Sequence, residues 1–461
     1  MKNLIIIFTF LISSVSVAKI GRSPASIGEK TLLLENLVNN NLIYSAQEII
    51  RSDLQNNKWA NNYERYLDVI ISEIGTEQLD RIDLSSRQLR ESKNLNYISG
   101  KNLLRRGKAK EAASKLKNSL SQEKEFYPNQ LFLYATALLL EGKKNEAMNN
   151  FVECENILRT NMERDDSLFA QEKQIIKDTC ILNQARLDFE NGNFLQANQQ
   201  YEKIRKSSLV WPEILFEEAW SSFYLGNFNR TLGKLVTYKS PFFDFIFNPE
   251  VEVLEALSYM ELCFYQNTQD VVNNFYNNYG NDAQYLKKFL SRYSSQQSKV
   301  GSLLINFKNR AAIKNKLLSR LLNSISKDLV FKRLMKNYQG IKDEINLVKN
   351  YPDKRYISYL AKNLKLAEQR QKKLIGIYGL RILDRANRVL DKSFRGMSYI
   401  KLEILKKEKD KFFGKDYKTG KIGDLKNVEF DSRHYLWEFN GEFWADELGD
   451  YVFSLKSECK I

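Results

Sequence analysis

The stretch NYISGKNLLRRGKAKEAASKLKNSL (Asn96–Leu120) contains the pattern that decides the fold of this chain. A small residue, Gly100, is followed seven residues later by Gly107, then five further on by Ala112, and four after that by Leu116. The small residues let two helices approach closely. The second glycine can end the first helix in a left-handed conformation, which its missing Cβ allows. The spacing therefore predicts a helix–turn–helix unit.

The same spacing recurs three more times. The stretches are LFLYATALLLEGKKNEAMNNFVECENIL (Leu131–Leu158), CILNQARLDFENGNFLQANQQYEKI (Cys180–Ile204) and ILFEEAWSSFYLGNFNRTLGKLVTY (Ile214–Tyr238). Successive turn glycines stand 35, 50 and 34 residues apart. Two intervals match the period of tetratricopeptide repeats, and the third has about sixteen extra residues, which we assign to the polar stretch Thr160–Lys173. The pattern resembles the tetratricopeptide repeat family and predicts an all-α solenoid.

A fifth, weaker unit follows, PEVEVLEALSYMELCFYQNTQDVVNNFY (Pro249–Tyr276). It keeps the small residue Ala256 but has Cys263 where the turn glycine would stand. At the other end, residues 26–74 have the pattern of amphipathic helices and are interpreted as a degenerate repeat. We therefore assign 19–95 to N-terminal helices and 96–279 to a solenoid of about five repeats.

Residues 280–426 have a different character. Apolar residues recur at gaps of three and four, as in Leu318, Leu322, Ile325 and Leu329, which predicts long amphipathic helices. Breaks at Gly340, at Tyr351–Pro352 and in 414–423 indicate three or four of them. A hairpin or bundle is favoured over an extended coiled coil, because no strict heptad persists.

The positive charge of the chain is concentrated in the same region. Residues 301–430 contain 32 Lys and Arg against 13 Asp and Glu, whereas the rest of the chain carries a net charge of −4. One interpretation is a solvated face of lysine-rich helices. The other is a surface that binds an anionic envelope polymer or lipid headgroups.

Residues 427–461 form an aromatic block, HYLWEFNGEFWADELGDYVFSLKSEC in its central part. The Asn440–Gly441 pair between aromatic residues is compatible with a β-hairpin. Alternatively, Glu442–Leu448 is a short helix ended by Gly449, and we favour this reading, with a strand at Tyr451–Ser457. In both cases we expect the block to be a cap over an apolar helix face, which a solenoid needs at its ends.

The first residues, MKNLIIIFTFLISSVSVAK, have the order of a secretory signal peptide: one base, a short apolar run, and small residues up to Ala18. We expect residues 1–18 to be removed. The rest of the sequence has no stretch approaching the roughly 20 apolar residues of a membrane span. The sequence therefore predicts an exported protein of the periplasm or cell envelope, without a transmembrane span after cleavage, and makes a nucleic-acid partner improbable.

Catalytic motifs are missing from the sequence. His434 is the single histidine, and no nucleophile, metal-binding or phosphate-binding motif is present. We expect a non-enzymatic protein without a cofactor or metal. Cys154 in the second unit and Cys180 in the third belong to neighbouring helices, and they are either a disulfide or two buried thiols. Cys263 is expected to pack as a small apolar residue.

Three stretches carry a narrower resemblance: Phe216–Phe243, Asn248–Cys263, and WEFNGEFWADELGDYVFSLKSEC (Trp437–Cys459). They resemble exported repeat proteins of predatory and gliding delta-proteobacteria, some of which are labelled adventurous gliding motility proteins. The resemblance implies an envelope scaffold whose partners are other envelope proteins. It implies no catalytic residues, and it does not extend to the N-terminal third.

The tetratricopeptide resemblance also implies where a partner binds. In that family the first helix of each repeat lines the concave surface, and residues there that are not needed for packing contact the ligand. On this basis the candidate contacts are Asn183, Arg186, Glu217, Ser221 and Tyr224. The predicted function is a scaffold that binds partner proteins in a repeat groove. The alternative is binding of anionic polymer or lipid headgroups through the basic helices.

Overall fold

The computed structural model describes residues 23–24, 26–160, 168–307, 313–412 and 441–459. Every regular element within these residues is a helix, so the predicted all-α class is confirmed. None of the described helices combines the length and apolarity that crossing a bilayer requires. The expected signal peptide (1–18), His434 and the first part of the aromatic block lie outside the described residues.

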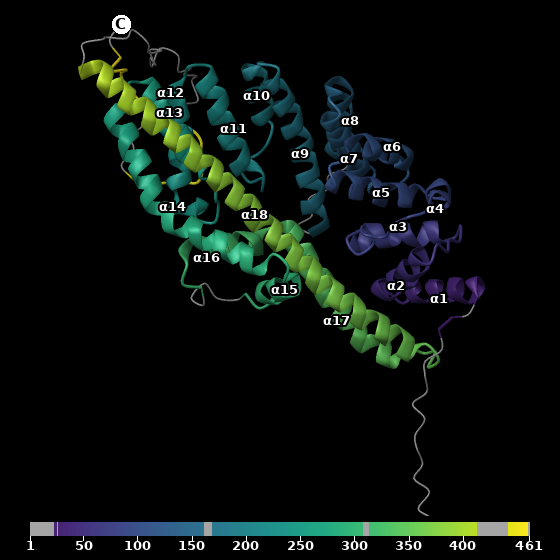
Figure 1. Cartoon of the computed structure of the whole chain (residues 1–461). Coiled ribbons are helices and arrows are strands. Elements are labelled where there is room, and N and C mark those ends of the chain that lie inside the picture. The colour runs from purple at the N-terminus through teal and green to yellow at the C-terminus, as the bar shows by residue number, and fades with distance from the viewer. Residues whose placement is uncertain (1–22, 25, 161–167, 308–312, 413–440, 460–461) are drawn as a thin grey trace, which may run out of the picture.

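The helices follow one another along the chain in a simple order (Figure 1). The first eight are α1 (Ile27–Asn39), α2 (Ile43–Gln55), α3 (Tyr63–Ile74), α4 (Ser86–Glu91), α5 (Lys93–Arg105), α6 (Ala109–Ser119), α7 (Tyr127–Leu140) and α8 (Lys144–Thr160). Those after them are α9 (Leu168–Glu190), α10 (Phe194–Tyr201), α11 (Trp211–Tyr224), α12 (Phe228–Val236), α13 (Glu250–Glu261), α14 (Tyr265–Tyr293), α15 (Gln297–Ile305), α16 (Lys316–Lys327), α17 (Leu329–Leu347) and α18 (Ile357–Phe412). Short 3₁₀ turns are η1 (Thr237–Lys239), η2 (Pro241–Phe243) and η4 (Val348–Asn350).

The five repeat units are the helix pairs from α5–α6 to α13–α14, and each pair turns through the same local device. The four turn glycines have φ between 74° and 83°, and Cys263 takes the same left-handed conformation with φ 62°. The next N–H then donates to the carbonyl five residues back, as Lys108 does to Leu103 at 3.0 Å. This bond satisfies a carbonyl that the helix end would leave unpaired. The predicted helix–turn–helix units are confirmed.

The small residue of the first helix is required by packing. A Cβ added to Gly100 would lie 2.5 Å from the side chain of Leu116, the bulky residue of the second helix. In the next three units the equivalent position is an alanine with no exposed surface, Ala135, Ala185 or Ala219. The positions that identify the repeats in the sequence are therefore the positions at which the two helices of a unit contact each other.

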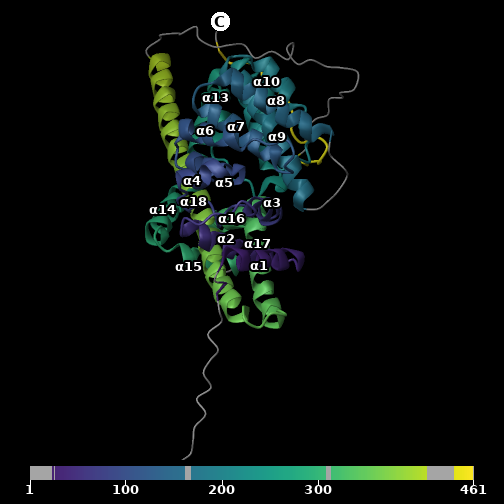
Figure 2. The same cartoon turned by 90° about the vertical axis from the view of Figure 1, so that its right-hand side faces the viewer.

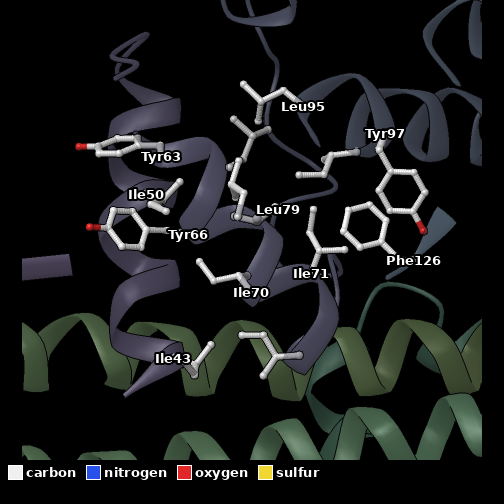
Figure 3. Close-up of a cluster of buried hydrophobic side chains, with 14 of the residues drawn as sticks. Ile43, Ile50, Tyr63, Tyr66, Ile70, Ile71, Leu79, Leu95, Tyr97 and Phe126 are labelled. Carbon is white, nitrogen blue, oxygen red and sulfur yellow. The ribbon is translucent and has the colours of Figure 1, made fainter. Parts of the chain in front are cut away.

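The N-terminal helices extend the same architecture. α1 and α2 form a hairpin in which Asn41 has φ 57° and Leu42 donates to the carbonyl of Leu37 at 2.8 Å. Apolar side chains from α2, α3 and α5 point toward one another in one continuous core (Figure 3). Tyr97 and Phe126 pack together with ring centroids 5.3 Å apart, and the core continues past them to Phe151 of α8.

The basic region contains α15 to α18 and the end of α14. A predicted break at Tyr351–Pro352 separates η4 from α18, but the break predicted at Gly340 is wrong, because Gly340 lies inside α17. A Cβ at Gly340 would lie 2.5 Å from the ring of Tyr44, so this glycine serves a close contact with α2 and not a turn. Glycine within a helix is a weak break signal for this reason.

α18 has 56 residues and is therefore about 84 Å long. It crosses the molecule from the N-terminal helices to the last repeat (Figure 1, Figure 2). Near its start, Leu360 and Leu364 are buried in the same core as α1–α3. Further along, Leu390 and Met397 share a core with residues of α13 and α14. One helix thus joins both ends of the repeat array.

α15 packs on the middle of α18 through two glycines. A Cβ added to Gly376 would lie 1.8 Å from the carbonyl oxygen of Gln297, and a Cβ on Gly301 would lie 2.0 Å from the carbonyl oxygen of Lys372. The two backbones are in direct contact, so no larger residue fits at either position without moving a helix.

The four cysteines form two disulfides. Cys154 of α8 is bonded to Cys180 of α9, with Cα atoms 6.4 Å apart, which ties the second unit to the third. Cys263 is bonded to Cys459, with Cα atoms 5.1 Å apart. The interpretation of Cys263 as a packed thiol is therefore wrong, because its left-handed turn brings it next to the C-terminal segment.

The C-terminal segment, residues 441–459, lies along the repeats as an extended chain. Neither the short helix Glu442–Leu448 nor the strand Tyr451–Ser457 is present, and 445–449 is a turn. The N–H of Phe453 donates to the carbonyl of Asn229 in α12 at 3.1 Å, and that of Glu458 to the carbonyl of Leu262. A single chain bound to helices has no neighbouring strand to pair with, so it forms no sheet.

The segment covers α11, α12 and the end of α13. Leu448 is buried with Trp211 of α11, and Phe453 packs against the cluster around Phe228 of α12. Trp444 of the aromatic block is 60% exposed. Trp437 and Phe439 lie outside the described residues.

Because Leu448 is buried and Trp444 is exposed, we expect truncation of these two side chains to have different effects. We expect Leu448→Ala to weaken attachment of the segment by about 2 kcal/mol, since a buried side chain at the edge of a cluster is lost. Trp444→Ala should change stability by less than about 0.5 kcal/mol, as exposed positions usually do. Hydrogen exchange of residues 441–459 measures both. Equal protection in the two variants would contradict the placement.

Candidate protein-binding site

A pocket of about 320 Å³ lies between the first helices of the third and fourth units. Its walls come from α9 and α11, and Tyr201 at the end of α10 lies beneath. We call it the aromatic pocket. It is lined by Arg186, Phe189, Tyr201, Glu217, Trp220 and Tyr224.

Four rings pack together on one side of the aromatic pocket, three of them partly buried and the fourth, Tyr224, exposed. Tyr224 lies parallel to Phe194, with centroids 5.1 Å apart and planes at 7°, and it stacks on Trp220 at 5.8 Å. Phe189 meets the edges of both Phe194 and Tyr224. Tyr224 is nevertheless 52% exposed. Rings that are rigidly held and still exposed offer contact area at little entropic cost, which is typical of binding surfaces.

The opposite side of the pocket is polar. Nε of Arg186 donates to Oε1 of Glu217 at 2.9 Å, and another nitrogen of Arg186 donates to Glu213 at 2.7 Å. The hydroxyl of Tyr201 donates to Oε2 of Glu217 at 3.0 Å. These bonds connect three successive helices, α9, α10 and α11.

Burial and pairing act against each other in this polar group. Burial raises the pKa of the Glu217 carboxyl, and the Arg186 guanidinium only partly offsets the effect. Burial alone would lower the pKa of Arg186, but its bonds to Glu217 and Glu213 raise it. Two carboxylates thus share one guanidinium. Glu217 lines the pocket, and Glu213, one helical turn away on α11, lies beside it.

Three of the residues predicted from the sequence, Arg186, Glu217 and Tyr224, meet in this pocket. Asn183 does not line it; its side chain donates to the carbonyl of Thr179 on its own helix at 2.8 Å. Ser221 is fully buried, and its hydroxyl donates to the carbonyl of Glu217, so the structure does not place it among the residues that line this pocket. Its place on α11 faces the interior of the repeat.

Sequence reasoning missed Phe189, Tyr201 and Trp220. Trp220 and Tyr224 stand four residues apart, a spacing that puts two rings on one face of a helix. This spacing could have identified Trp220 from the sequence. The position of Phe189 on the neighbouring helix could not be predicted, because it depends on how the repeats pack.

The pocket has the composition of a recognition site. Its apolar wall suits an aliphatic or aromatic side chain, and the excess carboxylate beside it suits a basic group. Among the described residues, no cluster of three or more His, Cys, Asp and Glu side chains could hold a metal ion.

Comparison with known proteins does not assign the chain to a family. No protein-family model and no curated protein matches the chain. A search of solved structures finds the Rap conjugation gene regulator of the plasmid pLS20 in complex with the Phr* peptide. It is 9% identical, the match covers 75% of this chain and 95% of the regulator, and the TM-score is 0.30. The assignment of a tetratricopeptide-type solenoid therefore rests on the helix pairs and their left-handed turns.

Proposed function

We propose that this chain is a non-enzymatic scaffold that binds a partner protein in the aromatic pocket. The observation that carries the proposal is the exposed ring of Tyr224, which is held by contact with Phe189, Phe194 and Trp220 at the wall of a pocket. A large aromatic side chain that is held in place and left exposed beside a pocket is typical of a surface that a partner covers. The partner segment we expect places an apolar side chain on Tyr224 and a basic group near Glu213.

We further propose that the scaffold works in the periplasm or at the cell envelope, with other envelope proteins as partners. The signal-peptide pattern of residues 1–18 supports export. The resemblance to delta-proteobacterial gliding-motility repeat proteins supports a place in an envelope or motility complex. Mass spectrometry of the mature N-terminus tests this proposal; a chain that retains Met1 in the cytosol would contradict it.

The site variant we choose is Tyr224→Ala. Arg186 and Glu217 are less suitable, because their bonds hold α9 to α11 and replacing them would also disturb the fold. Tyr224→Ala removes half-exposed contact area, and we expect it to reduce capture of the partner from envelope extract by about tenfold or more. The stability change should stay near the ~1 kcal/mol that ring stacking contributes.

The matched control is Tyr399→Ala, because Tyr399 is 72% exposed on α18, away from the pocket. It should capture the partner as the unmodified protein does. If Tyr224→Ala and Tyr399→Ala capture the same proteins in the same amounts, the aromatic pocket is not the binding site.

A further inference from the structure

A second pocket, of about 620 Å³, lies where the N-terminal helices meet the long helices. Its walls come from the segment after α3, from α5, and from α17 and α18. We call it the basic pocket. Six cationic side chains line it: Arg81, Lys101, Arg105, Arg106, Arg333 and Arg381. Glu77 is the one carboxylate among the residues of its lining.

Glu77 pairs with two of these cations. It accepts from Arg333 at 2.7 Å and from Lys101 at 3.3 Å. Burial alone would raise its pKa, but Lys101 and Arg333 outweigh burial and lower the pKa to about 2. Glu77 therefore serves to hold Lys101 and Arg333 in place, and Arg333 also pairs with Glu172 outside the lining.

The outer part of the basic pocket is only partly neutralised. Arg105 pairs with the buried carboxylate of Asp80, and Arg106 lies 3.9 Å from Asp83, but Arg81 and Arg381 have no hydrogen bond or ion pair within the part of the chain that the structure describes. Burial lowers the pKa of Arg381, and the like charges of Arg105 and Arg81 lower it further. Three guanidinium groups from three separate segments thus converge and repel one another.

The pocket also has an apolar wall, formed by Val330 of α17 and by Leu374 and Ile377 of α18. Val330 is 41% exposed. On an ordinary solvent-exposed helix face the cations are spread out, whereas here they line a recess that also has apolar side chains. A converging set of arginines in a recess concentrates positive potential and suits a compact anion.

We propose that the basic pocket binds a small soluble molecule that carries two or more phosphate groups, held by Arg81, Arg105 and Arg381. Guanidinium groups match phosphate oxygens in pairs of hydrogen bonds, which favours phosphate over a single carboxylate. The volume exceeds what one phosphate fills, and the apolar wall accommodates an organic part. The site is built from the segment after α3 and from α5, α17 and α18, so it is separate from the aromatic pocket on α9 and α11.

Binding would also act on the fold. The ligand would bridge the segment after α3 and α5, at the start of the repeat array, to α18, the helix that joins the two ends of the array. A ligand that binds only the folded arrangement stabilises it by mass action. We therefore expect inorganic triphosphate, used as the probe, to raise the unfolding temperature and to bind less tightly as salt increases.

The test is calorimetric titration of the full chain with inorganic triphosphate. Arg81→Gln combined with Arg381→Gln should weaken binding by about tenfold or more, since two charge-assisted contacts are lost. Arg388→Gln combined with Arg395→Gln removes the same charge from exposed positions on α18 outside the pocket and should leave binding unchanged. Asn102→Asp, an isosteric change in the pocket lining, should also weaken binding, because it adds a negative charge.

Two results would overturn the proposal. One is binding that the pocket pair and the control pair weaken equally, with no effect of Asn102→Asp, since this shows attraction to overall charge. The other is no binding of triphosphate by the unmodified protein; if vesicles containing phosphatidylglycerol then bind, the charge serves a membrane surface and not a soluble ligand. Asn102→Asp keeps the test decisive even if the double arginine variant does not fold.

Discussion

Glu344→Ala is expected to lower the free energy of unfolding by about 3 kcal/mol or more, because three buried donors would lose their acceptor at about 1–3 kcal/mol each. Glu344 lies on α17, yet it caps the N-terminus of α2. Its Oε1 accepts from the N–H of Tyr44, and its Oε2 accepts from both the N–H and the hydroxyl of Ser45, all at 2.8 Å. Leu42, at the cap position of α2, offers no side-chain bond of its own.

The loss would be large because the donors would stay buried without a partner. The rest of the α2–α17 contact depends on the same alignment, since the hydroxyl of Tyr44 donates to Asn337, and Asn337 donates to the carbonyl of Ile74. Urea unfolding followed by circular dichroism measures the change. Asp343→Ala is the control, because Asp343 is exposed and one residue away. Equal effects of the two changes would show that α17 does not cap α2.

Gly376→Leu should cost about 3 kcal/mol or more, at the upper end of what overpacking costs. The Cβ of any larger residue at this position would overlap the carbonyl oxygen of Gln297 and approach the N–H of Gly301. Because both obstacles are backbone atoms of α15, no side-chain rotation relieves them, and α15 has to move away from α18.

The measurement combines urea unfolding with small-angle X-ray scattering, which reports whether the molecule becomes less compact. Gly280→Leu is the control, since a Cβ at Gly280 in the helix α14 meets nothing within 4 Å. That change should leave stability unchanged or raise it by up to about 1 kcal/mol through helix propensity. A Gly376→Leu protein as stable and compact as the Gly280→Leu protein would contradict the close packing of α15 on α18.

The repeats could be predicted from the sequence because the device that makes them is local. The left-handed turn at Gly107 and the contact of Gly100 with Leu116 involve residues less than one repeat apart, so their spacing is visible in the sequence. The role of Gly340 could not be predicted from the sequence. A glycine that ends a helix cannot be distinguished there from one that makes room for a tyrosine ring of another helix.

The long-range features could not be predicted for the same reason. Glu344 caps a helix that begins about 300 residues earlier, and Cys459 is bonded to a cysteine 196 residues before it. No spacing rule connects such positions. The aromatic content of the C-terminal block indicated burial, but which ring is buried depends on the path of the segment over α12, and Trp444 lies on its outer side.

The candidate site was predicted in part. Of the contacts predicted on the first helices of the third and fourth units, Arg186, Glu217 and Tyr224 line one pocket. Ser221 does not line it, because its side chain faces the interior of the repeat, and the direction in which α11 turns its residues depends on packing that the sequence does not show. The pairing of Arg186 with Glu217 was also not foreseen, because it joins two repeats.

Site-specific photo-crosslinking in cells tests most directly whether a partner protein binds in the aromatic pocket. A benzophenone amino acid replaces Tyr224 in one variant, and exposed Leu195 on α10 or exposed Tyr399 on α18 in two others. We expect the variant at 224 to give one defined covalent adduct with a second protein, whose crosslinked peptide carries a basic residue beside the attached side chain. The variants at 195 and 399 should not give that adduct. No adduct at 224, or the same adducts at all three positions, would contradict binding in the aromatic pocket.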